Sequence, residues 1–149
     1  MVRALELHMA HDFPSEPWAS AFAQAINDNP RYAETGASWT HGAVALVVKA
    51  DVALGIEQDM AIVLDVDSGK CRAASYVSAS DAREQASFVI EGLYARWETL
   101  IREGHDPIKT LMQGKLKLTK GHLPTLIRYV ESSKELLVSA QRVPTEFRS

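Results

Sequence analysis

The segment 106–126, DPIKTLMQGKLKLTKGHLPTL, constrains the fold most because its hydrophobic period changes twice. It opens with an acidic residue and a proline, a typical helix start, and its apolar residues then repeat at helical spacing until Gly114. Residues 115–119 alternate polar side chains with leucine, as a half-buried strand does. Gly121 predicts a turn, and Pro124 predicts the start of another helix. This switch from helix to strand to helix predicts a fold that contains both helices and a sheet.

Four more strands are predicted earlier in the chain. Alternation of apolar residues begins after His41, and residues 67–70, Asp-Ser-Gly-Lys, predict a tight hairpin turn before a strand at 71–77. The β-branched and aromatic run 87–92 predicts another strand. The apolar residues on one face of these strands are Val44, Leu46, Val48, Met60, Ile62, Leu64, Val66, Phe88 and Ile90. With 115–119 the sequence therefore predicts five strands, each with one apolar face.

Amphipathic helices accompany these strands. Ser15 is a predicted N-cap, and residues 27–30 end the helix that follows it. Gly104 ends a second helix, and a last helix is expected from Pro124 onwards. The apolar stripes of the three helices contain Trp18, Phe22, Ala25, Ile26, Leu93, Tyr94, Trp97, Leu100, Ile101, Leu126, Ile127, Val130, Leu137 and Val138. Each stripe must be buried, and the apolar face of the sheet is the available partner.

Composition narrows the class of protein. With 149 residues, 46% of them hydrophobic, the chain is expected to form one domain over 1–149, with 1–14 and 142–149 as terminal segments. Its net charge of -3 gives no overall attraction to nucleic acid. The longest small or apolar run, 42–48, is too short to span a bilayer, and the N-terminus does not have the pattern of a signal peptide. The single cysteine, Cys71, is typical of a reducing compartment, so a cytoplasmic location is expected.

The ordered set of elements resembles the sterol carrier protein 2 family, also called SCP-2 sterol-transfer proteins. The similarity runs from about Trp18 to Leu137. Its most specific part is the opening segment, with GKLKL at 114–118 and the turn glycine at 121. The motifs SEPW, NDNPRY and WTHG nearer the N-terminus are similar to those of bacterial and archaeal members. The resemblance implies an α+β fold, in which helices cover one face of a five-stranded, largely antiparallel sheet and an apolar tunnel lies between the two layers.

The same resemblance implies non-catalytic binding and transfer of a lipid, such as a fatty acid, an acyl-CoA ester or a sterol. It implies no enzymatic activity, cofactor or metal. Two features depart from the family pattern. His122 follows the turn glycine where relatives often have an acidic or small residue, and the C-terminal Phe147-Arg148-Ser149 is not the Ser-Lys-Leu address of peroxisomal members. An accessory or protein-interaction module with the same fold and a filled core is the alternative function.

The apolar residues expected to line the tunnel come from the strands and from the helices on both sides of the GKLKL segment. Methionine in such a position adapts to ligands of different shape. Each of these side chains could equally pack in a filled core, because an apolar stripe does not distinguish a cavity from a core. The expected lining residues are Leu46, Leu64, Phe88, Trp97, Leu100, Leu111, Met112, Leu116, Leu126 and Tyr129.

A local excess of positive charge lies in residues 107–130, which contain five basic side chains and no acidic one. Lys115, Lys117 and Lys120 are the candidates for contact with an anionic lipid headgroup or a membrane surface. Protection of a sheet edge by lysines is an alternative explanation. The expected partners are a lipid or acyl ligand and, transiently, a membrane surface, with no nucleic acid, in a monomer or homodimer.

Other groups of residues are weaker candidates for a metal-binding or catalytic site. His8, His11 and Asp12 have the spacing of metal ligands, but a solvated terminal segment is the preferred interpretation. Asp65 and Asp67 flank the hairpin turn and are expected to be exposed. Cys71 is expected to act as a small buried hydrophobic residue. The sequence contains no glycine-rich phosphate loop, no GxSxG elbow and no HExxH helix.

Overall fold

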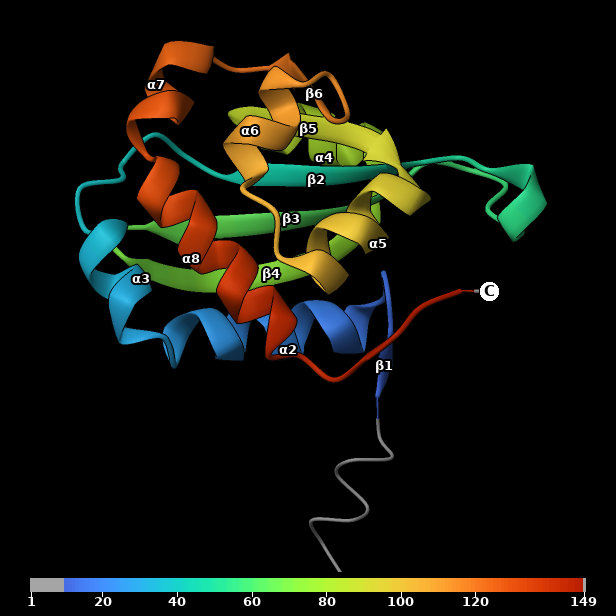
Figure 1. Cartoon of the computed structure of the whole chain (residues 1–149), viewed down its shortest axis with the longest axis horizontal. Coiled ribbons are helices and arrows are strands. Elements are labelled where there is room, and N and C mark those ends of the chain that lie inside the picture. Colours follow the sequence, from blue (N-terminus) through green and yellow to red (C-terminus); the bar gives the residue numbers. More distant parts are fainter. Residues whose placement is uncertain (1–9, 149) are drawn as a thin grey trace, which may run out of the picture.

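The computed structural model describes residues 10–148. A five-stranded sheet forms its centre, with the strand order β4-β3-β2-β5-β6 (Figure 1). The β2–β5 pair is parallel and the other three pairs are antiparallel, so the largely antiparallel sheet predicted from the sequence is confirmed. The strands are β2 (Val44–Lys49), β3 (Met60–Asp67), β4 (Lys70–Ser78), β5 (Phe88–Leu93) and β6 (Lys117–Lys120).

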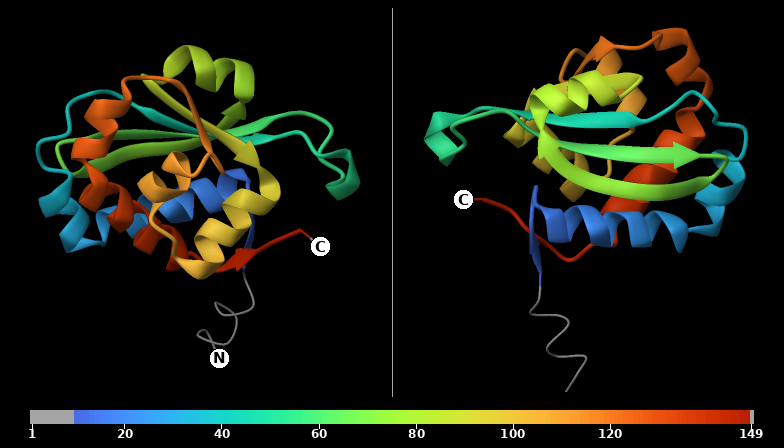
Figure 2. Two further views of the ribbon diagram at one scale, coloured as in Figure 1. Left: turned by 45° about the horizontal axis from the view of Figure 1, so that its top comes forward. Right: turned by 180° about the vertical axis from the view of Figure 1, so that it is seen from behind.

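Most helices lie on one face of this sheet, while α4 lies on the other (Figures 1 and 2). No helix within residues 10–148 is long and apolar enough to cross a bilayer. The helices are α2 (Glu16–Asn27), α3 (Pro30–Thr35), α4 (Ala79–Gln85), α5 (Tyr94–Glu103), α6 (Pro107–Met112), α7 (Leu123–Arg128) and α8 (Val130–Gln141), with a 3-10 turn, η1 (Val52–Leu54), between β2 and β3.

The helix ends follow the capping residues of the sequence. The Ser15 side chain accepts a hydrogen bond from the Trp18 amide at 3.2 Å, as expected for the N-cap of α2. Asp106 caps α6 in the same way, with Pro107 in its first turn. Gly104 ends α5 in a left-handed conformation that favours glycine. These local signals determine where α5 ends and where α6 begins.

The last helix differs from the sequence prediction because it is divided in two. Tyr129 separates α7 from α8 and has the non-helical torsions φ -109° and ψ 33°. Its hydroxyl donates a hydrogen bond to the Ser38 carbonyl oxygen at 3.0 Å, and its ring packs edge-on against Trp39. Contacts with a loop far away in the sequence therefore stabilise the break, and local helical periodicity did not reveal it.

The second face of the sheet is also partly buried, whereas the sequence predicted one apolar face for each strand. Ala45 and Val47 of β2 and Ala61 of β3 form a small cluster with Ala79 and Ala82 of α4. Small side chains on both elements allow the helix to approach the sheet closely. The view from behind shows α4 crossing this face (Figure 2).

The described parts of the terminal segments pack onto the domain. β1 (His11–Asp12) and β7 (Thr145–Glu146) form a short parallel pair. Phe13 is buried, and its carbonyl oxygen accepts a hydrogen bond from the Tyr94 hydroxyl at 3.1 Å. The Trp18 indole N–H donates to Thr145 Oγ1 at 2.9 Å. These contacts hold Phe13 against α5 and Thr145 against α2.

Candidate functional site

An apolar cavity of about 100 Å3, partly open to solvent, lies between the sheet and the helices that cover it. Apart from the indole nitrogens, the polar side-chain atoms of the lining belong to two tyrosines and two serines. The lining residues are Phe13, Trp18, Phe22, Tyr32, Trp39, Val44, Leu46, Leu64, Val66, Ile90, Trp97, Leu100, Ile101, Pro107, Leu111, Leu116, Leu126, Tyr129, Ser132, Ser133, Leu136, Leu137 and Ala140.

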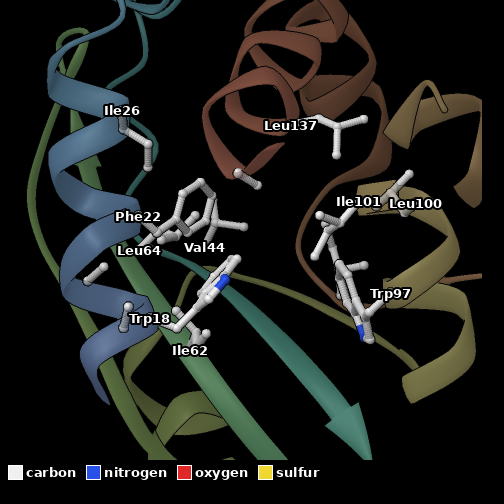
Figure 3. Close-up of a cluster of buried hydrophobic side chains, with 14 of the residues drawn as sticks. Trp18, Phe22, Ile26, Val44, Ile62, Leu64, Trp97, Leu100, Ile101 and Leu137 are labelled. Atoms are coloured by element: carbon white, nitrogen blue, oxygen red, sulfur yellow. The ribbon is translucent and has the colours of Figure 1, made fainter. Parts of the chain in front are cut away.

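Two helices supply opposite walls of the cavity. Trp18 and Phe22 point inward from α2, while Trp97 and Ile101 point toward them from α5 (Figure 3). Leu137 of α8 extends between these two walls (Figure 3). The i, i+4 spacing within each helix places both side chains of a pair on the same side. The floor is formed by alternate residues of β2, β3 and β5, whose side chains share one face of the sheet.

The polar atoms of the aromatic wall already have partners. The Trp97 indole N–H donates to the Val47 carbonyl oxygen at 3.0 Å, and that of Trp39 donates to the Gly42 carbonyl oxygen at 2.9 Å. Burial raises the pKa of Tyr32 to about 12, so its hydroxyl stays neutral at physiological pH. The wall thus presents ring faces and hydrocarbon, without an ionised group, to any molecule in the cavity.

The size of the cavity limits what it holds in this conformation. A cavity of about 150 Å3 accommodates one benzene ring, so about 100 Å3 is too small for a complete long acyl chain. A ligand of that length requires the helices and the sheet to move apart. The hollow is nevertheless larger than the gaps in an ordinary close-packed core, few of which exceed a water molecule.

The structure brings eight of the ten proposed lining residues together around this cavity. Phe88 is buried against Trp39, with ring centroids 5.1 Å apart, but lies outside the lining. Met112 is 63% exposed near the end of α6 and also lies outside it. The eight residues on the lining are Leu46, Leu64, Trp97, Leu100, Leu111, Leu116, Leu126 and Tyr129.

The aromatic residues from the N-terminal part of the chain were missing from the sequence-based site. Trp18 and Phe22 were assigned to a helical stripe, and Trp39 was considered only as part of the WTHG motif. All three line the cavity. The apolar stripe of α2 carried the relevant signal, but its position over the sheet depends on tertiary structure.

The three lysines proposed for headgroup or membrane contact do not gather at one site. Lys115 lines a second cleft, which lies between α5 and α6. Lys117 is exposed on β6. Lys120 donates hydrogen bonds from Nζ to the carbonyl oxygens of Arg83 at 2.9 Å and Glu84 at 3.5 Å. Lys120 therefore contacts the last turn of α4, which lies on the opposite face of the sheet.

The other candidates have local structural explanations. His8 lies outside the described residues, His11 and Asp12 form β1, and residues 10–148 contain no cluster of potential metal ligands. The Asp65 carboxylate pairs with Arg72 at 2.9 Å. Burial raises the pKa of Cys71 to about 11, so its thiol remains protonated at neutral pH.

Together, the sheet, the helical layer and the apolar cavity define an α+β domain built around an internal hydrophobic hollow. The chain belongs to the SCP-2 sterol transfer family, whose sequence profile matches residues 24–122. The family and fold predicted from the sequence are therefore confirmed. No functionally curated protein matches the chain.

Solved structures of sterol carrier proteins are similar to this chain over most of its length. A crystal structure of sterol carrier protein 2 is 33% identical, with a TM-score of 0.79, and the match covers 87% of this chain and 97% of the other. A conserved protein of Thermus thermophilus, described as a candidate sterol carrier, is 32% identical, with a TM-score of 0.80 and coverages of 89% and 90%. Apo sterol carrier protein 2 of Yarrowia lipolytica shares the fold at 16% identity, with a TM-score of 0.51 and coverages of 82% and 88%.

Proposed function

We propose that this protein binds a hydrophobic ligand, such as a fatty acid, an acyl-CoA ester or a sterol, between its sheet and its helical layer. The apolar cavity is the observation that carries this proposal. Membership of the SCP-2 sterol transfer family supports it, as does the similarity to proteins named sterol carriers. In this proposal the protein stores or transfers its ligand and does not transform it.

Burial of hydrocarbon provides the binding free energy. Each methylene group removed from water contributes about 0.8 kcal/mol, so a chain of about sixteen carbons gains on the order of 10 kcal/mol before association and ordering costs. The satisfied indole N–H groups and the neutral Tyr32 add no desolvation cost from an uncompensated charge. Such a site selects by shape and apolar surface.

Ligand uptake requires the small cavity to widen, and the side formed by α6 and α7 is suited to this movement. Each of these helices has six residues, and Gly114 follows α6 with a positive φ of 75°. Leu111 and Leu126 reach the cavity from these two helices. Outward movement of α6 and α7 would enlarge the cavity while the sheet remains intact.

The outer surface of the same two helices supports transient contact with a membrane. Met112 on α6 is 63% exposed and Ile127 on α7 is 41% exposed. Lys109 and Arg128 lie on these helices, and residues 107–130 contain no acidic side chain. Exposed apolar residues among basic ones are suited to an anionic bilayer surface. A cytoplasmic location and a monomeric or homodimeric state remain predictions.

Lipid extraction from purified protein, followed by mass spectrometry, tests the proposed binding, together with titration of a fluorescent fatty acid. We expect a copurifying lipid or saturable binding of the probe near one molecule per chain. If neither is observed, the alternative function, an interaction module with a filled core, is favoured. Flotation with anionic liposomes tests the membrane contact separately, and replacing both Met112 and Ile127 with serine should reduce it.

A further inference from the structure

A second hollow, of about 450 Å3, lies between α5 and α6 and has a more polar lining than the first. Both helices lie on the same face of the sheet (Figure 1). The loop that joins them closes one end of this hollow, which we call the α5–α6 cleft. Its lining residues are Arg96, Thr99, Leu100, Gly104, His105, Asp106, Lys109, Thr110, Gln113 and Lys115.

Positive charge predominates in the α5–α6 cleft, although the whole chain has a net charge of -3. Arg96, Lys109 and Lys115 are exposed, and within residues 10–148 none of them forms an ion pair. Asp106 is the one carboxylate of the lining. Its Oδ1 accepts hydrogen bonds from the amides of Ile108 at 2.9 Å and Lys109 at 3.3 Å, so it caps α6. Three cations thus face solvent without a matching anion.

The α5–α6 cleft and the apolar cavity share a wall. Leu100 lines both of them. Thr110 lines the cleft, and the next residue, Leu111, lines the cavity. Likewise, Lys115 lines the cleft and Leu116 lines the cavity. In both pairs the polar residue therefore lines one space and the neighbouring apolar residue lines the other. A molecule with a charged head and an apolar chain could occupy both when the Leu100 side chain turns aside.

We propose that the α5–α6 cleft binds the anionic head, a carboxylate or a phosphate, of a single-chain lipid whose hydrocarbon chain occupies the apolar cavity. This inference rests on the proposed function and adds the ligand class and the position of its head. Lys109 and Lys115 supply the attraction, and Arg96 adds a guanidinium that can bind two oxygen atoms of a carboxylate or a phosphate. Thr99 and Gln113 are exposed hydrogen-bonding groups beside them.

The experiment compares two lipids that differ only in their heads, dodecanoate and dodecanol, as competitors for a bound fluorescent fatty acid at neutral pH. We expect the double variant Lys109→Gln/Lys115→Gln to bind dodecanoate about five- to tenfold more weakly, because two solvated charge interactions are lost. Its affinity for dodecanol should stay within about twofold of wild type. Added salt should reduce this difference between wild type and variant, since exposed charges are screened.

Lys70→Gln/Arg142→Gln is the matched control, because it removes two exposed positive charges outside the cleft. We expect its dodecanoate affinity to change by less than about twofold. An equal loss for both lipids in the cleft variant, or no loss for either, overturns the headgroup assignment and leaves the proposed function intact. Equal binding of inorganic phosphate and dodecyl phosphate also overturns the headgroup assignment, because the hydrocarbon chain of the lipid would then contribute nothing to binding. Failure of wild type to bind either lipid contradicts the proposed function itself.

Discussion

The hydroxyl of Tyr129 donates a hydrogen bond to the carbonyl oxygen of Ser38 at 3.0 Å, which joins the break between α7 and α8 to the loop before β2. The Ser38 hydroxyl lies 3.2 Å from the same phenol oxygen. The Tyr129 ring also packs edge-on against Trp39, with centroids 4.9 Å apart, and both rings line the apolar cavity. This contact therefore holds together two parts of the chain that border the cavity.

Tyr129→Phe should accelerate ligand uptake. The variant keeps the ring but removes the hydrogen bond, which is exposed and therefore contributes about 0.5–1 kcal/mol. If opening of this contact precedes binding, that free energy corresponds to an association rate about two- to fivefold higher. Stopped-flow mixing with a fluorescent fatty acid measures the rate. Tyr76→Phe, at an exposed tyrosine of β4 outside the cavity lining, is the control, and equal rates for all three proteins would count against this role.

Leu46→Trp should reduce ligand binding by filling the cavity. Leu46 lies on β2, lines the cavity and is only partly buried, so a larger ring has some room. We expect at least about a tenfold loss of affinity, with a change in the free energy of unfolding of no more than about 1–3 kcal/mol. Titration of a fluorescent fatty acid and urea denaturation measure the two effects. Val52→Trp adds the same ring at a residue that is 84% exposed, and it should leave binding unchanged. Full affinity in Leu46→Trp would place the ligand elsewhere.

The elements of this fold could be predicted from the sequence because their signals are local. Ser15 and Asp106 cap their helices, and Gly104 ends α5, through atoms within a few residues. The period-two alternation of apolar residues in β2 and β3 is also a local signal. The family resemblance supplied the way in which these elements are assembled.

The features that could not be predicted depend on contacts between distant residues. Met112 and Leu111 are adjacent in an apolar helical turn, yet Leu111 lines the cavity and Met112 is exposed, because the placement of α6 decides which of them faces inward. Lys120 belongs to a basic segment, but its partners are carbonyl groups of α4. Burial of the second sheet face likewise depends on where α4 packs.

Gly121→Ala should destabilise the fold. Gly121 has a φ of +107°, and a Cβ atom there would collide with the Phe88 ring, which is buried against Trp39. Backbone strain of this kind costs about 1–3 kcal/mol, and the collision adds to it. Gly114→Ala is a matched control with a φ of +75° and no atom within 4 Å of the added Cβ. Its free energy of unfolding should therefore fall less than that of Gly121→Ala. Urea denaturation of both variants measures the difference, and equal losses would mean that the Phe88 contact has no effect.

Arg83 of α4 pairs with two carboxylates, that of Glu91 on β5 and that of Asp59, which directly precedes β3. Its guanidinium lies 2.8 Å from the Asp59 carboxylate and 2.7 Å from that of Glu91. Partial burial by itself raises the pKa of Asp59, but hydrogen bonds from Arg83, the Ala50 amide and Lys49 outweigh it and lower that pKa to about 2. The hydrogen bond from Arg83 also lowers the pKa of Glu91. Both carboxylates are therefore charged and paired at neutral pH.

The lowered pKa of Asp59 predicts a loss of stability in acid. Because the folded-state pKa of about 2 is below the ordinary value of 3.8, the stabilisation is complete above about pH 4 and disappears as the pH falls through 2. With the side chain still 21% exposed, we expect Asp59→Asn to lose about 1–2 kcal/mol at neutral pH and to approach wild-type stability near pH 2. Urea denaturation across this range measures the convergence. Glu57→Gln removes an exposed carboxylate that has no ion pair within residues 10–148, so it should follow the wild-type curve. A constant difference between Asp59→Asn and wild type at every pH would mean that Asp59 stabilises the fold by packing and not by its charge.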